Sequence, residues 1–341
     1  MAEVWSAAWS GNLTREAKIA AISTLSVCGL GLAAYSLFRW KSSPRYDWQE
    51  VGKLSRIMIH PVKACRGLEV REAECTALGM KSSDGLFDRH YIIVDGENRF
   101  VTMRQKSGLA LLRTSQSDDG KYLLLDAPHM PTLRVPLNVP VTNDVIQFRL
   151  WGLEVEGYDC GVSVTCWLDR YLESSGNKLV CYTPDLQAKR NIDDPKWGKR
   201  MVHDKSVFQD ISHFHLCTVA SLNDLNSKLE NPVTMRPFRP NLVVEGVKEA
   251  WIEDDWKYVR IGENVILRKT HLCGRCKQTT VDPETGVVGD EPLKTLKTYR
   301  CMEPSHLDYK GLNGAPVFGI KLNLQSRSDT IAVGDTIYAS S

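Results

Sequence analysis

Short runs of hydrophobic residues, each broken after a few positions by glycine, aspartate or asparagine, fill most of the chain from residue 54 onward. Valine, isoleucine and aromatic residues favour β-strands, and turn residues separate one strand from the next. The pattern therefore predicts many short strands. Residues 91–104 and 258–269 each carry a central Gly-Glu-Asn sequence, which predicts a hairpin with its turn there. The last strands are predicted within residues 315–325 and 330–340, with a polar turn between them.

Three segments follow a helical pattern instead. Residues 163–175 place hydrophobic side chains on one helix face: Val164, Trp167, Leu168, Tyr171 and Leu172. Residues 221–231 begin with a serine that can cap a helix and stop before Pro232, and residues 292–300 form the third segment. Few helices among many strands predict a β-rich α+β fold of barrel-like domains rather than a doubly wound sheet. A domain boundary is predicted near residues 180–190.

The N-terminal region predicts a membrane anchor. Residues 19–38 carry no charge, and their length suits a helix that crosses a bilayer core of roughly 30 Å. Arg39, Lys41 and Arg45 follow directly, which predicts that the C-terminal side stays in the cytosol. We expect a tail over residues 1–18, an anchor over 19–38 and a linker over 39–53. A buried helix or a cleaved signal peptide is the alternative interpretation of the same segment.

Composition narrows the class of protein. Hydrophobic residues make up 43% of the chain and charged residues 25%, which is ordinary for a globular body. A net charge of +2 gives no overall field that would attract nucleic acid. The ten cysteines are scattered along the chain, which favours free thiols in a reducing compartment over a disulfide framework.

The segment THLCGRCKQTTVDPETG, residues 270–286, holds two of these cysteines, Cys273 and Cys276. A structural zinc site needs four ligands, and no second cysteine pair is visible. A thioredoxin-like pair needs a helix that starts at the first cysteine, whereas β-branched residues and an Asp-Pro turn follow here. Two free thiols in a loop, or one thiolate that binds a metal, are the other interpretations.

Basic residues at strand ends and turns favour the interpretation in which one thiolate binds a metal. Lys63 and Arg66 follow one predicted strand, Arg89 precedes another and Arg104 ends a third. The sequence MRPFRPN places Arg236 and Arg239 each before a proline and ends on Asn241, while Arg275 lies between the two cysteines. Proline restricts the backbone, so such a turn can hold an arginine against a phosphate at low entropic cost. A thiolate in the same pocket would suit a transition metal carried by that ligand.

Six segments in this order resemble the MOSC-domain family of molybdenum enzymes, and within it the amidoxime-reducing components: residues 59–67, 87–95, 101–105, 238–244, 273–286 and 333–338. The resemblance implies an N-terminal β-barrel-like domain over 54–184 and a MOSC domain over 185–341. It also implies that a molybdenum cofactor, a pterin dithiolene with a phosphate tail, binds between them. The implied contacts are Lys63, Ala64, Arg89, Ser212, Arg239, Asn241, Gly274, Arg275 and Cys276.

The resemblance assigns the metal ligand and catalytic residue to Cys276, with Cys273 a structural neighbour. Family members often carry serines where Ala64 and Gly274 stand, so two hydroxyl donors are absent here. The implied activity is reduction of amidoximes, hydroxylamines, hydroxamic acids and N-oxides, and of nitrite. Electrons would come from NADH through cytochrome b5 reductase and cytochrome b5, at the mitochondrial outer membrane with the catalytic body facing the cytosol. A cofactor carrier or persulfide sulfur-transfer protein is the alternative function.

Overall fold

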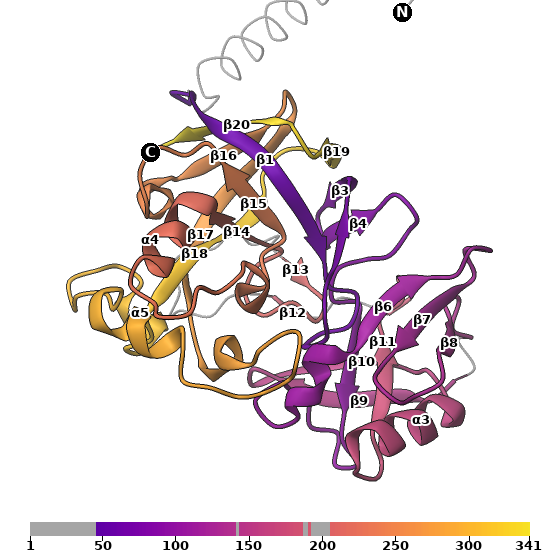
Figure 1. Cartoon of the computed structure of the whole chain (residues 1–341). Coiled ribbons are helices and arrows are strands. Elements are labelled where there is room, and N and C mark those ends of the chain that lie inside the picture. Colours follow the sequence, from indigo (N-terminus) through magenta and orange to yellow (C-terminus); the bar gives the residue numbers. More distant parts are fainter. Residues whose placement is uncertain (1–45, 141–142, 187–189, 192–204) are drawn as a thin grey trace, which may run out of the picture. The chain divides into compact units, whose positions relative to one another are not determined.

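The computed structural model describes residues 46–140, 143–186, 190–191 and 205–341 (Figure 1). The chain divides into two units, residues 1–46 and 47–341, and the fold below is that of the second. The predicted anchor over residues 19–38 lies outside the described residues. Within the described part, no helix combines the length and the hydropathy that a bilayer crossing requires.

Seven strands form a closed barrel (Figure 1). Their order is β15 (Leu242–Glu245), β14 (Phe214–Thr218), β18 (Val317–Leu324), β17 (Val265–Gly274), β16 (Tyr258–Ile261), β20 (Thr336–Ser340) and β1 (Gln49–Ile59). Pairing of β1 with β15 closes the ring, and β2 (Leu68–Val70) adds to β1 outside it. Neighbours are antiparallel except β14 and β15, which are parallel. A closed barrel leaves no unpaired edge along these strands, and it confirms the β-rich class.

The barrel interior is filled by aliphatic side chains from every strand, including Leu54, Ile57, Leu267, Ile320 and Ile337, each fully buried. Gly319 marks a close approach between β14 and β18. Its φ is +76°, and a Cβ there would lie 2.4 Å from the carbonyl oxygen of Leu216. A side chain at this position would force β14 and β18 apart, close to residues discussed below.

A second set of strands surrounds another hydrophobic core. Four form the sheet β5 (Tyr91–Val94), β11 (Lys178–Cys181), β10 (Leu153–Asp159) and β9 (Val145–Leu150). Three more form β6 (Arg113–Gln116), β7 (Tyr122–Asp126) and β8 (Leu133–Pro136). The helix α3 (Val162–Leu172) packs Val164, Trp167 and Leu168 into this core, as its sequence pattern predicts.

Strands from the N-terminal half of the described chain pair with strands from its C-terminal half. Strands β3 (Glu72–Thr76) and β4 (Gly79–Ser82) form a sheet with β19 (Asp329–Ala332), which comes from near the C-terminus. The predicted division at residues 184 and 185 stays a prediction. The pairings β1–β15 and β3–β19 each join strands from its two sides.

The remaining elements are short. They are η1 (Ser107–Leu111), β12 (Arg190–Asn191), β13 (Lys205–Ser206), α4 (Val219–Asn226), η3 (Arg236–Phe238), η4 (Ile252–Asp255), η5 (Lys277–Thr280), α5 (Leu293–Tyr299) and α6 (Tyr309–Leu312). The hairpin predicted over 258–269 is confirmed as β16 and β17, and the helix predicted over 292–300 is confirmed as α5.

Three details of the predicted elements were wrong. The helix predicted from Ser221 begins earlier, because the Thr218 hydroxyl caps it by accepting from the Ser221 amide at 3.2 Å, and it ends at Asn226. The hairpin over 91–104 has one strand, β5, whose partner arm makes a bridge at Phe100 but no second strand. The final run, 330–340, is two strands, because β19 pairs with β3 while β20 pairs with β1 and β16.

Candidate functional site

The loop that follows β1 provides the first set of candidate side chains. Its residue Ala64 has a left-handed φ of +66°, and the Lys63 amide donates to the Tyr91 carbonyl at 2.7 Å. The Lys63 side chain is buried along its length and its ammonium pairs with the Asp210 carboxylate. Burial would raise the pKa of Asp210, but Lys63, Lys321 and Arg89 outweigh it and hold the pKa well below its usual range.

The turn before β15 provides the second set. Pro237 helps to form η3, and Arg239 ends it with a left-handed φ of +53°. Asn241 is buried and joins three segments: its amide nitrogen donates to the Met58 carbonyl at 3.1 Å, and its side-chain oxygen accepts from the His215 amide at 3.2 Å. The turn is therefore fixed between β1 and β14.

Arg239 is a partly buried cation, and one of its donor atoms is buried without a partner among the described residues. One terminal nitrogen, Nη1, donates to the Cys65 carbonyl, whereas Nη2 is buried and has no hydrogen-bond partner within the described part of the chain. Burial and the neighbouring Arg89 lower the pKa of Arg239 to about 10. A buried unpaired donor on a charged group is costly, which makes this atom a natural partner for an anion.

Arg89 lies beside it and is itself buried. Its guanidinium pairs with the fully buried Asp88 carboxylate and donates to the Asn241 side-chain oxygen at 3.4 Å. Asp88 also accepts from the His60 amide at 2.8 Å. Burial, Arg239 and Arg89 hold the pKa of His60 well below its ordinary value, so the ring is neutral and adds no further positive charge.

Arg275 contacts the backbone that carries Arg239 and also contacts the ring of His215. Nε donates to the Phe318 carbonyl at 3.0 Å, Nη1 donates to the Phe238 carbonyl at 2.9 Å, and Nη2 contacts the ring of His215. The rings of Phe238 and Phe318 stack at 3.9 Å, with the guanidinium 5.4 Å from the centroid of Phe238. Burial and the Arg275 charge keep the pKa of His215 well below its ordinary value.

The two cysteines of the segment have different surroundings. Cys273 lies in β17 and is buried, whereas Cys276 is exposed at the start of η5. The Arg104 guanidinium lies 4.0 Å from the Cys276 sulfur. Only a four-residue 3₁₀ helix follows Cys276, and the first cysteine precedes no helix, unlike a thioredoxin-type pair. Among the described residues, no group of three or more histidines, cysteines and acids could hold a metal ion.

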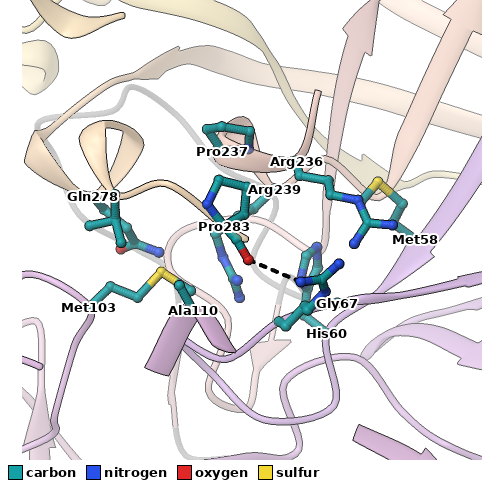
Figure 2. Close-up of a pocket in the computed structure, with 12 residues that line it drawn as sticks. Met58, His60, Gly67, Met103, Ala110, Arg236, Pro237, Arg239, Gln278 and Pro283 are labelled. Carbon is teal, nitrogen blue, oxygen red and sulfur yellow. Dashed lines mark hydrogen bonds between the residues drawn. The ribbon is translucent and has the colours of Figure 1, made fainter. Parts of the chain in front are cut away.

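A pocket lies between these parts of the chain (Figure 2). The pocket is lined by residues from the loop after β1, from the FRPN turn and from the segment after Cys276, among them His60, Arg239 and Gln278. Arg66 donates a hydrogen bond of 3.0 Å to the Pro283 carbonyl. The dashed line at Pro283 in Figure 2 marks this bond. Arg66 also makes two bonds of 2.9 Å to the Glu284 carboxylate, so the VDPETG turn is clamped to the loop after β1.

Family models match most of the chain. The MOSC N-terminal beta barrel domain matches residues 51–175, and the MOSC domain matches residues 203–338. The chain belongs to the MOSC family. It is 39% identical to "Mitochondrial amidoxime-reducing component 1" of Homo sapiens over 92% of each chain. It is 38% identical to the protein of that name in Xenopus laevis, over 92% of this chain and 90% of the relative. With "Mitochondrial amidoxime reducing component 2" of Rattus norvegicus the identity is 35% over 92% of each.

In this MOSC protein, several of the residues predicted to contact a cofactor come together. Lys63, Arg89, Arg239 and Asn241 lie within one network of contacts, which also includes the loop at Ala64. Arg275 adjoins that network, but its hydrogen bonds go to backbone carbonyls and to His215. Ser212 is buried and bonds to the Thr270 hydroxyl at 2.7 Å. Their roles toward a ligand stay predictions.

Gly274 has a packing reason to lack a side chain. A Cβ there would lie 2.9 Å from the end of the Leu312 side chain and 3.5 Å from the Ala315 methyl. A serine at this position would therefore require Leu312 to move. Ala64 instead occupies a left-handed conformation, which costs a residue with a side chain more than it costs glycine.

Sequence reasoning missed several residues of the site. Asp88, Asp210, His60 and Lys321 surround the predicted cations, and Trp151 donates to Asp210 at 3.1 Å. His60 stands inside the segment IHPVKACRG and could have been found there. Asp210 stands two residues before the predicted contact Ser212, whereas nothing in the sequence links Trp151 to Asp210.

Proposed function

We propose that this MOSC protein binds a molybdenum cofactor and reduces N-hydroxylated compounds such as amidoximes, hydroxylamines, hydroxamic acids and N-oxides. The main supporting observation is the exposed thiol of Cys276, two residues before Gln278, which lines a pocket together with Arg239. Nη2 of Arg239 is a buried donor without a partner among the described residues. Family membership and relatives named for amidoxime reduction support the same proposal. Nitrite is a further substrate that the proposal includes.

The side chains present fit a phosphate-bearing cofactor. Lys63, Arg89 and Arg239 gather in one network whose acids are the fully buried Asp88 and the partly exposed Asp210. A phosphate would pair the Nη2 donor of Arg239 and offset the repulsion that lowers the pKa of this arginine. Arginine suits the task, because its planar guanidinium can make two parallel bonds to one phosphate.

The thiolate of Cys276 would hold the metal. When bound, the cofactor supplies a two-electron redox centre that can remove oxygen from nitrogen. The chain fixes where this happens: β17 and η5 present the Cys276 sulfur to solvent, and Arg104 holds a positive charge 4.0 Å from it. Cys273 is buried and belongs to the barrel wall, so we assign it a structural role.

Other residues position the site. Arg275 fixes the carbonyl of Phe238 and therefore the turn that carries Arg239. Asn241 ties the same turn to β1 and β14, and Arg66 holds the VDPETG turn over the pocket. Lys63, Ala64, Ser212 and Gly274 complete the proposed cofactor contacts. At Ala64 and Gly274, backbone amides rather than side-chain hydroxyls would serve.

Electrons must reach this centre from outside, because the sequence carries no flavin, haem or nicotinamide motif. We propose NADH, cytochrome b5 reductase and cytochrome b5 as the source.

The proposed location is the mitochondrial outer membrane, with residues 19–38 as a single anchor and the catalytic body facing the cytosol. Protease added to intact mitochondria should then digest the body, and its protection would contradict this topology.

The full chain in detergent provides the test. We expect about one molybdenum per chain, and oxidation of NADH that requires benzamidoxime, cytochrome b5 and its reductase together. The same exposed Cys276 thiol could instead carry a persulfide or pass a cofactor on. A protein with that function would release the cofactor to an acceptor and leave NADH unchanged, which would overturn the reductase proposal.

A further inference from the structure

The turn between β9 and β10 presents a bulky side chain in an unusual conformation. Trp151 and Gly152 form this two-residue turn, with φ of +54° and +84°. Positive φ at both positions is typical of the hairpin turn that favours asparagine, aspartate or glycine. A tryptophan here is strained, and strained residues are concentrated at functional sites. The conformation of the turn does not favour tryptophan, so its presence points to the contacts that the indole makes with other residues.

Contacts hold the indole in one position while leaving much of it open. Its N–H donates to the Asp210 carboxylate at 3.1 Å, and its ring lies 5.3 Å from the ring of Phe100. The Arg104 guanidinium lies 5.9 Å from the indole centroid. Trp151 nevertheless stays 49% exposed. Aromatic groups that are fixed on one side and open on the other are suited to stacking.

Those contacts place Trp151 at the edge of the proposed site. Arg104 links it to the exposed sulfur of Cys276, and Asp210 links it to the buried Lys63. Phe100, Arg104 and Arg149 also line a cleft of about 630 Å³ that is open to solvent. Phe100 and Arg104 therefore belong to the cleft and also contact the indole, and Arg104 contacts the Cys276 sulfur as well.

We propose that Trp151 is a specificity-determining residue, and that its indole stacks on the flat conjugated part of aryl N-hydroxylated substrates. This inference rests on the proposed function and names the substrate class of the same site. An aryl amidoxime is planar from its ring to its nitrogen–oxygen bond, so the ring can lie on the indole while that bond points toward Cys276. Small alkyl amidoximes have no such ring and gain nothing from it.

The structural alternative is that Trp151 only ties the hairpin to Asp210 through its N–H. Phenylalanine separates the two, because Trp151→Phe keeps an aromatic ring and loses that hydrogen bond. Trp151→Ala loses both. Leu153→Ala is the matched control, because Leu153 lies in the same hairpin and is 43% exposed.

The experiment compares these three variants with the full chain as holoenzyme. Molybdenum content is measured first, then kcat and KM for benzamidoxime and acetamidoxime. We expect Trp151→Ala to raise the KM for benzamidoxime about three- to tenfold, the range that aromatic pairing supplies. Its KM for acetamidoxime, its kcat and its molybdenum content should stay as in the unchanged protein. Trp151→Phe and Leu153→Ala should behave as the unchanged protein.

Binding of benzamidine, an unreactive analogue of the substrate ring, is measured by calorimetry on the same proteins and needs no turnover. Weaker binding in Trp151→Ala alone would support the inference even if no substrate were reduced, which would reject only the proposed function. Equal KM changes for the aryl and alkyl substrates would overturn it. A Trp151→Phe protein that behaves like Trp151→Ala, or unchanged benzamidine binding in Trp151→Ala, would overturn it as well.

Discussion

The guanidinium of Arg275 donates a hydrogen bond of 2.9 Å to the carbonyl oxygen of Phe238, the residue directly before Arg239. Two motifs far apart in the sequence are thereby joined: the pair of cysteines and the FRPN turn. The bond sets the position of the backbone that carries Arg239. A change at Arg275 is therefore expected to reach the proposed anion site indirectly.

Arg275→Lys tests this relationship. Lysine keeps the charge but cannot donate to the carbonyls of Phe238 and Phe318 in one plane. Leaving a buried carbonyl unpaired typically costs roughly 1–3 kcal/mol, so the melting temperature should fall and molybdenum content with it. Thermal unfolding and metal analysis on the same sample measure both. Lost metal at an unchanged melting temperature would instead mean that Arg275 contacts the cofactor directly.

Arg239→Ala should purify with little molybdenum while remaining folded. Removing a charge-assisted bond in a pocket costs roughly 1.5–3 kcal/mol, about ten- to a hundredfold in affinity. Arg239→Lys should recover part of the metal, because it restores charge without the planar fork. Arg134→Ala removes an exposed cation and is the charge-matched control. Full metal content together with impaired folding in Arg239→Ala would reject the phosphate contact.

Cys276→Ala should abolish N-reduction, because the proposed metal loses its protein thiolate. Cys273→Ala should retain most activity and lose some stability, since Cys273 is buried in the barrel wall. NADH oxidation with benzamidoxime measures the first effect and thermal unfolding the second. If the two variants have the same activity, the assignment of these cysteines is wrong.

The free energy of unfolding should fall steeply as pH drops below about 6.5. Burial, together with nearby arginines at two of the three residues, lowers the pKa of His60, His215 and His90, the last to about 3. The unfolded chain then binds protons that the folded chain does not, and each such histidine contributes roughly 1.4 kcal/mol per pH unit. Urea unfolding between pH 7 and 5 should show a smaller slope in His60→Asn than in His129→Asn, an exposed control. Equal slopes would contradict the assignment.

The sequence predicted the local features of this protein well. Hydrophobic periodicity found the face of α3, and the Gly-Glu-Asn turn found the β16–β17 hairpin, because both depend on neighbouring residues. The start of α4 was missed, because Thr218 lies at the end of β14 and its capping role appears only where the strand meets the helix. Residues 330–340 form two strands and not one, because β19 pairs with β3 and β20 pairs with β1. These partners lie 250 or more positions earlier in the sequence, so local patterns could not reveal them.

The site shows the same division. Arginines and prolines in the FRPN turn predicted a rigid basic feature, and the structure places Arg239 in a left-handed turn with a buried donor. Arg275 was expected to face a ligand, yet most of its donors serve backbone carbonyls and His215. The sequence could not assign Asp88 and Asp210 as the ion-pair partners of Arg89 and Lys63. That assignment requires knowing which of the many carboxylates the fold brings close to each cation.

Closure of the barrel has a consequence for protein synthesis. Strand β1 (Gln49–Ile59) leaves the ribosome long before its partner β20 (Thr336–Ser340), because most of the described residues lie between the two strands. Until then β1 has one edge without this neighbour, and the barrel cannot close. A premature stop that removes residues 336–341 should therefore leave an open, aggregation-prone sheet despite loss of under a tenth of the chain, since exposed strand edges pair with other chains. The amount of such a truncated protein in the soluble fraction of expressing cells measures this directly.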